Sequence, residues 1–126
     1  MYLLVNLSQR DTIQLALFDE HKIEHKSSSG SNREVLAAID DLLHEQNLDK
    51  TDVTGIMVVV GTGGFTSTRI GVVVANSFAY ILGIPVLAIE ESDIASIQDL
   101  IPKLQKQPKG QYITAAYSGE PNIGQK

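Results

Sequence analysis

The stretch that decides the fold runs from residue 56 to residue 82 and reads IMVVVGTGGFTSTRIGVVVANSFAYIL. Residues 56–60 are all apolar and mostly β-branched, which predicts a strand that is buried on both faces. A glycine-rich turn follows, and residues 66–82 predict a long helix with few polar positions. A buried strand that leads through a glycine turn into a helix indicates an α/β protein.

The segments before this unit predict an antiparallel meander and a helix. Residues 2–7, 12–18 and 21–26 predict three strands, and residues 33–46 have apolar positions at helical spacing. The third strand is expected at a sheet edge, where His21, Lys22, His25 and Lys26 would oppose pairing with another strand.

The segments after the unit predict one more strand–helix repeat. Residues 85–89 predict a second buried strand, Ser92 is expected to cap a helix that ends near residue 104, and residues 112–116 predict a closing strand. Of these six predicted strands, five are expected in one mixed sheet, in which a three-strand meander joins parallel strands and helices cover the faces.

Size and composition set the outer limits on function. The chain has 126 residues, 43% of them hydrophobic, a net charge of −5 and no cysteine. We expect one lobe over residues 1–117 and a tail over residues 118–126. The lack of cysteine excludes disulfides, thiolate metal sites and thiol catalysis. The excess of acidic residues disfavours a broad nucleic-acid surface, and the lack of a basic leader favours a cytoplasmic location.

One uncharged stretch between Arg69 and Glu90 is long enough to raise the question of a membrane span. Asn76 and Ser77 lie at its centre, and the sequence Gly83-Ile84-Pro85 interrupts it near the end. A buried helix followed by a buried strand is the favoured interpretation, and we expect no contact with a membrane.

The glycine turn at residues 61–69 is open to three interpretations. A phosphate-binding Walker loop needs a lysine, which the turn lacks. A dinucleotide site would use Gly61, Gly63, Gly64 and Thr66, with Glu90 near the position of a ribose-binding acid, although Thr66 replaces the third glycine of that motif. In the third interpretation the glycines only permit a tight turn before a capped helix.

The helix after the turn carries apolar residues on every side. A helix that lies on a sheet buries one stripe, so a helix that is apolar all round needs a second cover. The helix at residues 33–46 is one candidate cover, and a partner protein is the other.

The remaining polar groups form no catalytic or metal-binding set. His21 and His25 are four residues apart in a predicted strand, which separates them by about 13 Å. His44, the pair Asp40-Asp41 and the pair Glu90-Glu91 are expected at the solvated surface. The basic loop at residues 103–109 could contact RNA phosphates, but solvated loop charge is the favoured interpretation. No catalytic residue, metal or cofactor is therefore predicted.

The segment Val60-Gly61-Thr62-Gly63-Gly64-Phe65-Thr66-Ser67-Thr68-Arg69-Ile70-Gly71 resembles the Gly-Pro-Gly-Ser-Phe-Thr-Gly-Val-Arg-Ile-Gly signature of the TsaB (YeaZ) family. Residues 75–92, with an apolar helix, Gly-Ile-Pro and a second strand, are similar to the next part of that family. The resemblance covers nearly the whole chain, and residues 61–71 are its specific part.

This resemblance implies an actin-like, RNase-H-like (ASKHA) lobe. It also implies a role in forming threonylcarbamoyladenosine (t6A) at position 37 of tRNA. Members of the family act as a dimerisation scaffold for the catalytic, metal-binding TsaD subunit, and the ATPase TsaE joins the assembly. For this chain the resemblance implies a TsaD-like partner, a homodimer in isolation and only indirect contact with tRNA.

In that family the first two helices contact the partner. Carried over to this sequence, the interface residues are Val35, Ile39, Leu42, Leu43, Arg69, Ile70, Val73, Val74, Ser77 and Phe78.

Several positions depart from the family pattern. The first strand ends in Asn6-Leu7-Ser8, where actin-like nucleotide sites have an aspartate. Thr62, Gly64 and Ser67 replace the proline, serine and later glycine of the turn, and Tyr117 stands at a family aspartate. Most family members carry a second lobe, which completes the nucleotide cleft, and we expect this chain to consist of the first lobe alone.

The sequence therefore predicts a non-catalytic scaffold subunit that resembles TsaB. The alternatives are a small nucleotide-binding or dinucleotide-binding domain that uses residues 61–66, and a homodimeric regulatory module of another function.

Overall fold

The computed structural model describes residues 1–9, 11–30, 34–61 and 65–109, with the backbone alone for residues 65–68. The strands are β1 (Tyr2–Asn6), β2 (Thr12–Phe18), β3 (Ile23–Ser29), β4 (Gly55–Val59) and β5 (Val86–Ile89). The helices are α1 (Val35–Glu45), α2 (Phe65–Leu82) and α3 (Ile101–Gln105), with 3₁₀ segments η2 (Lys50–Asp52) and η3 (Glu91–Leu100).

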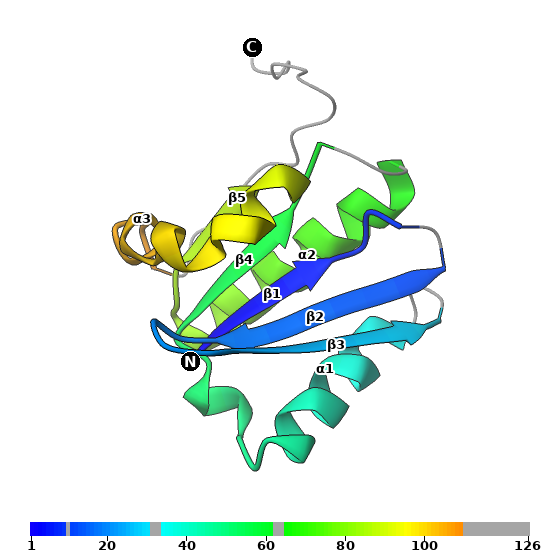
Figure 1. The fold of residues 1–126 in the computed structure, drawn as a ribbon, viewed down its shortest axis with the longest axis horizontal. Coiled ribbons are helices and arrows are strands. Elements are labelled where there is room, and N and C mark those ends of the chain that lie inside the picture. Colours follow the sequence, from blue (N-terminus) through cyan, green and yellow to red (C-terminus); the bar gives the residue numbers. More distant parts are fainter. Residues whose placement is uncertain (10, 31–33, 62–64, 110–126) are drawn as a thin grey trace.

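The strands form one mixed sheet in the order β3-β2-β1-β4-β5 (Figure 1). β1, β2 and β3 are successive antiparallel neighbours, whereas β4 pairs parallel with β1 and β5 pairs parallel with β4. This arrangement confirms the predicted α/β lobe with a five-stranded mixed sheet. The predicted strand at residues 112–116 and the predicted tail at residues 118–126 lie outside the described residues.

Each face of the sheet packs against a different set of helices (Figure 1). On one face, α1 and α2 share a core with alternate residues of the strands, among them Leu3, Val5 and Leu15. On the other face, η3 and α3 bury Ile97, Ile101 and Leu104 against the remaining alternate residues. The period of two along each strand places successive side chains in these two cores.

The third strand begins two residues later than the sequence predicts. The carboxylate of Asp19 accepts hydrogen bonds from the backbone N–H groups of His21 and Lys22, at 2.8 and 3.0 Å. These two bonds lower the pKa of Asp19 below its usual range. Because they hold residues 19–22 in a turn, β3 starts at Ile23 and continues through the serines at residues 27–29.

The segment after β5 differs from the single capped helix that the sequence predicts. The first turn is closed by Asp93, whose carboxylate accepts the backbone N–H of Glu90 at 2.9 Å, so Ser92 is not the cap. Residues 91–100 form the 3₁₀ segment η3, which is interrupted by non-helical angles at Ser96, and only residues 101–105 are α-helical. The segment begins two residues earlier than predicted, with Glu90 at the N-cap and Asp93 at the third position, so Ser92 lies within the first turn.

Helix α2 packs closely on the sheet but is covered on one side only. A Cβ atom added to Gly71 would lie 3.3 Å from Cγ2 of Val58 in β4, so glycine permits the close approach. Val72, Ala75 and Ala79 are buried, whereas Val73 and Ile81 are 61% and 77% exposed. Helix α1 lies on the same face of the sheet and leaves these exposed residues uncovered. No helix within the described ranges is long and apolar enough to cross a membrane.

Candidate functional site

The first candidate site is the edge of the sheet at which the parallel strands β1, β4 and β5 end. Ligands of open α/β sheets bind outside the carboxyl ends of such strands. Asn6 is the last residue of β1, Gly61 follows β4, and Glu90 follows β5, so these three residues occupy that edge.

Asn6 is a structural group at this edge. Its side chain is 1% exposed. Its Nδ2 atom donates a hydrogen bond to Oε1 of Gln14 at 2.8 Å, and its Oδ1 atom accepts the backbone N–H of Ser8 at 3.0 Å. The amide thereby ties the end of β1 to β2 and to the turn between them. An aspartate would lack the donor to Gln14, so the residue fits a turn support better than an anionic ligand for a metal.

The glycine turn is only partly described. Gly61 has a φ of 87°, in the region that glycine adopts without strain, and Thr66 lies in α2. Gly63 and Gly64, the other two residues of the possible cofactor site, lie outside the described residues. The prediction of a dinucleotide site at this turn is therefore untested.

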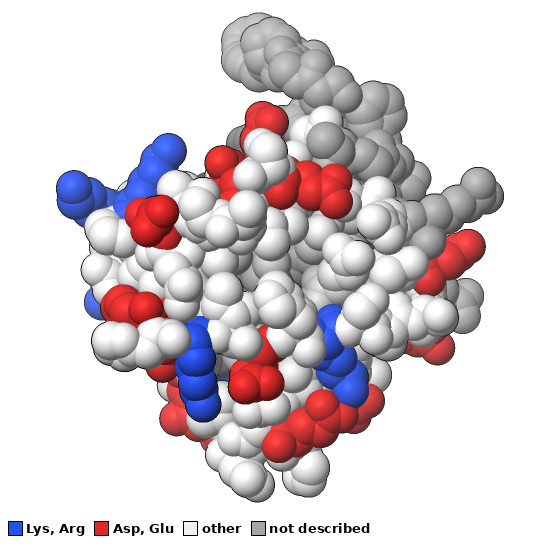
Figure 2. Space-filling model, in the orientation of Figure 1, with Lys and Arg blue, Asp and Glu red and all other residues white. Residues whose placement is uncertain are grey.

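The electrostatics of the edge disfavour phosphate. Glu90 and Glu91 are exposed, and the Asp93 carboxylate accepts the N–H of Glu90, which is then unavailable to a ligand. Figure 2 shows acidic side chains gathered on this face, over the segment that contains η3. Carboxylates repel a phosphate at short range, so Glu90 and Glu91 oppose an anionic ligand at this edge.

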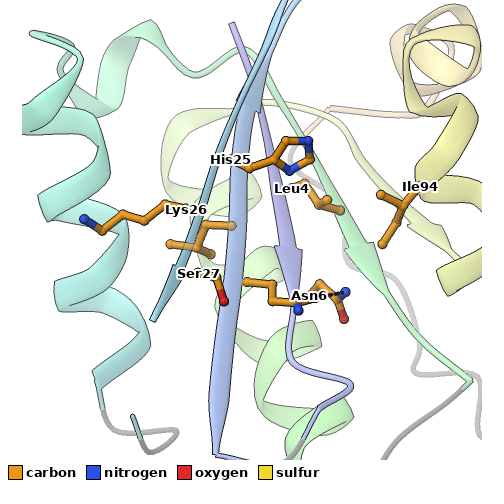
Figure 3. A pocket seen from close by; sticks show the side chains of 8 residues that line it. Leu4, Asn6, His25, Lys26, Ser27 and Ile94 are labelled. Atoms are coloured by element: carbon orange, nitrogen blue, oxygen red, sulfur yellow. Dashed lines mark hydrogen bonds between the residues drawn. The ribbon is translucent and has the colours of Figure 1, made fainter. Parts of the chain in front are cut away.

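A second feature is a hollow of about 330 Å³ beside the same edge, on the face that η3 covers in part. Its lining residues are Leu4, Asn6, Gln14, Leu15, His25, Lys26, Ser27 and Ile94. Figure 3 shows His25, Leu4 and Ile94 on the side of η3, whereas the Lys26 side chain points away towards α1. The hollow is thus mostly uncharged, with amide, imidazole and hydroxyl groups beside aliphatic walls.

The third feature is an exposed stripe on α2, which we call the α2 stripe. It consists of Arg69, Val73, Ser77, Tyr80 and Ile81, all exposed. Positions 69, 73, 77 and 81 are four residues apart and therefore share one side of the helix. Ile70 and Val74 are partly buried beside it and pack on the core beneath. Exposed apolar side chains gathered on one helix face are typical of a protein–protein contact.

The predicted interface residues divide between this stripe and the core. Arg69, Val73 and Ser77 are exposed, and Ile70 and Val74 are half-buried. Phe78 and the four residues of α1, namely Val35, Ile39, Leu42 and Leu43, are at most 8% exposed and belong to the core. A partner could not contact these five side chains without moving α1 or α2. Sequence reasoning missed Tyr80 and Ile81, although the apolar outer side of α2 pointed to them.

The other polar groups lie where solvated charges are expected. His21, His25 and His44 are exposed, and the described residues contain no cluster of three or more metal-ligating side chains. Asp40 is 3.6 Å from the Nζ atom of Lys50, and Asp41 is exposed. Lys103, Lys106 and Lys109 are exposed, and the backbone of Lys109 bridges to Pro85.

Three comparisons with known proteins agree on one family. A family model described as "TsaD: tRNA N6-adenosine threonylcarbamoyltransferase" matches residues 25–118. The chain is 29% identical over 115 residues to the tRNA threonylcarbamoyladenosine biosynthesis protein TsaB of Bacillus subtilis, covering 84% of this chain and 50% of that protein.

Solved structures with the same fold come from Pseudomonas aeruginosa. YeaZ matches with a TM-score of 0.67 and 25% identity, over 82% of this chain and 50% of its own. A protein described as similar to peptidase YeaZ matches with a TM-score of 0.66 and 26% identity, over 79% of this chain and 48% of its own. The chain thus spans about half the length of the relatives it matches.

The family match covers all the described helices, β4, β5 and most of β3, and the individual relatives are TsaB and YeaZ proteins. The chain therefore belongs to the TsaD family of tRNA N6-adenosine threonylcarbamoyltransferase proteins and is a TsaB/YeaZ-like member with an ASKHA-type fold.

Proposed function

We propose that this chain takes part in t6A modification of tRNA as a non-catalytic scaffold, which binds a TsaD-like catalytic subunit through the α2 stripe. The observation that carries the proposal is the exposure of Val73 and Ile81, at 61% and 77%, on a helix whose inner side is fully packed. The name of the B. subtilis relative refers to threonylcarbamoyladenosine biosynthesis, and this similarity is the reason for proposing t6A modification.

The α2 stripe is suited to docking because its inner support is rigid. Ala75 and Ala79 are fully buried, and Gly71 holds the helix close to β4. A partner would therefore meet a surface that needs little ordering on binding, which lowers the entropic cost of association. Burial of valine and isoleucine side chains would contribute about 1.5–3 kcal/mol each.

The non-catalytic part of the proposal rests on the edge of the sheet. Asn6 occupies the position of an actin-like aspartate and uses both ends of its amide within the chain. The acidic residues Glu90 and Glu91 face the same edge. Neither feature supplies a cationic group that could stabilise a transferring phosphate, and the described residues contain no cluster of three metal-ligating side chains.

Binding is tested by calorimetry between the chain and a TsaD-like protein from the same source. Val73→Glu should weaken binding at least tenfold, because a carboxylate would be buried without a partner. Val73→Thr keeps the shape and should retain part of the affinity. Ala95→Glu adds the same charge at an exposed position on the opposite side of the sheet and should leave binding unchanged. Absence of binding by the unaltered chain would refute the proposal.

The scaffold role is tested in a reconstituted tRNA reaction, with t6A measured by mass spectrometry of nucleosides. We expect no product from the chain alone and more product when it joins the TsaD-like subunit. Product from the chain alone, or heat of binding with ATP or NAD, would instead support an enzymatic or nucleotide-binding role.

A further inference from the structure

The hollow beside the end of β1 is lined by side chains that lie in two rows across three strands. Asn6 pairs with Gln14, and Gln14 pairs with Ser27, so these residues form one polar row. Leu4 and His25 stand on either side of β2 in the next row. Because side chains alternate between the two faces of a sheet, both rows project from the face that η3 covers in part.

One backbone group fixes the orientation of both side-chain amides in the polar row. The backbone N–H of Ser8 donates to Oδ1 of Asn6 at 3.0 Å, so Nδ2 is the end of Asn6 that faces Gln14. This Nδ2 atom donates to Oε1 of Gln14 at 2.8 Å. Nε2 of Gln14 is the end left over, and no group in the described part of the chain accepts a hydrogen bond from it. The hollow therefore has a donor whose orientation is set before any ligand binds.

The other walls favour a flat and uncharged ligand. Figure 3 shows His25 and Ile94 on either side of Leu4, so an imidazole ring and two aliphatic side chains border the same space. Lys26 is the only lysine or arginine among the described lining residues, and its Nζ atom lies 2.6 Å from Oε2 of Glu45 in α1. The volume of about 330 Å³ is at the lower end of the range for small-molecule sites. Flat, uncharged nucleobases commonly stack on histidine rings.

The available hydrogen-bonding groups discriminate between nucleobases. A free glutamine side chain pairs with adenine, because its amide donates to N7 and accepts from the N6 amino group. In this hollow Oε1 of Gln14 is already engaged by Asn6, so the amide offers the N–H groups of Nε2. Guanine and hypoxanthine present two adjacent acceptors, N7 and O6, which match N–H donors.

We propose that this hollow binds an uncharged 6-oxopurine base, as in inosine or guanosine, with N7 and O6 on Nε2 of Gln14 and the ring beside His25. The base belongs either to a free nucleoside or to an unpaired nucleotide of an RNA, which present the same edge. The site lies on the face of the sheet opposite to the α2 stripe, and it does not depend on the proposed function.

The test is calorimetry of the full chain with inosine and with adenosine, at nucleoside concentrations up to about 1 mM. Inosine should bind about tenfold more tightly, because the N6 amino group of adenosine sets a donor opposite a donor. In an isotopically labelled chain, the nuclear magnetic resonance signal of the Gln14 side-chain amide should shift when inosine is added.

Asn6→Asp tests the orientation of the two amides. A carboxylate at this position still accepts the N–H of Ser8, but it has no hydrogen to donate to Gln14. The Gln14 amide should therefore turn over and present Oε1 to the hollow, so that adenosine binds more tightly than inosine. A folded variant, as judged by thermal unfolding, that still prefers inosine would contradict the proposal.

Two further variants test the site without changing the buried amide. Gln14→Glu replaces the donor with an acceptor and should lower the affinity for inosine about tenfold or more. Gln9→Glu is the matched control, because Gln9 is exposed and lies outside the hollow. His25→Ala removes the stacking ring and should lower the affinity about tenfold, whereas His21→Ala, at an exposed residue outside the hollow, should leave it unchanged.

A short single-stranded RNA with one guanine separates the two sources of the base. Tighter binding of this RNA than of inosine supports a base within RNA, and weaker binding supports a free nucleoside. Binding of the RNA without any binding of inosine would place the affinity in the phosphates and overturn the proposal. So would the absence of binding by either ligand, equal affinities for inosine and adenosine, or an unchanged affinity in Gln14→Glu.

Discussion

Helices α1 and α2 pack on the same face of the sheet, yet they expose very different surfaces. Helix α1 buries Val35, Ile39, Leu42 and Leu43 and turns acidic residues to solvent. Helix α2 buries Ala75, Phe78 and Ala79 and still leaves Val73 and Ile81 exposed on its outer side. The resemblance to TsaB predicted both helices at an interface, but α1 leaves only Leu36 as a large exposed apolar side chain, whereas α2 leaves Val73, Tyr80 and Ile81.

This difference shows that an apolar residue in a helix indicates a partner only when the chain's own core does not bury its side chain. In α1 the apolar positions except Leu36 and Ala37 form one stripe, which is buried against the sheet. In α2 the apolar positions surround the helix, and one sheet cannot cover both sides. The predictions below test this contrast between inner and outer residues, from the largest expected effect to the smallest.

The largest contrast is expected within α2, between Phe78 and Ile81. Phe78→Ala should lower the free energy of unfolding by about 3–5 kcal/mol, because it leaves a cavity in the core. Ile81→Ala should change it by less than about 0.5 kcal/mol, since that side chain is 77% exposed. Urea unfolding measures both values. Equal losses would show that Ile81 is covered and that the α2 stripe is not a free surface.

The same contrast is expected within α1, between Ile39 and Leu36. Ile39 is fully buried and Leu36 is 54% exposed. Ile39→Ala should destabilise the chain by about 2–5 kcal/mol, whereas Leu36→Ala should cost less than about 0.5 kcal/mol. A small effect at Ile39, together with retained affinity for a TsaD-like partner, would mean that α1 is not packed as described.

Gly71 tests the close packing of α2 on β4. Gly71→Ala should destabilise the chain by about 1 kcal/mol, because the overpacking cost exceeds the gain in helix propensity. In a Val58→Ala background the clashing Cγ2 atom is absent, so the same change should become stabilising. Thermal unfolding of the unaltered chain, the two single variants and the double variant completes a double-mutant cycle. Additive changes in the free energy of unfolding would exclude a direct contact between residues 58 and 71.

The ion pair between Lys26 and Glu45 tests how α1 is tied to the sheet edge. Its side chains are 29% and 54% exposed, so Lys26→Met, which keeps most of the aliphatic stem, should cost no more than about 1 kcal/mol. The effect should shrink at high salt, because ions screen exposed pairs. A larger loss in the free energy of unfolding that does not depend on salt would show that the contact between Lys26 and Glu45 contributes more than an exposed ion pair does to the packing of α1 on the sheet.

Much of the architecture could be predicted from local pattern. The apolar runs at β1, β4 and β5 and the spacing in α1 and α2 identify their elements to within two residues. The start of β3 and the cap of η3 could not be predicted, because each depends on which nearby carboxylate reaches an open N–H group. The interface also could not be predicted in full. The resemblance predicted ten interface residues, and only the structure shows which of them are exposed and which belong to the core.

The sequence by itself determined the α/β class, the strand–turn–helix unit and the excess of apolar surface on α2, because these follow from local composition and periodicity. Only the tertiary structure decided which side of each helix is covered, and that Asn6 is tied into a turn rather than presented to a ligand. It also decided that Asn6, Gln14 and Ser27 lie in one row across three strands. These features depend on contacts between distant segments, and no local pattern records which segments meet.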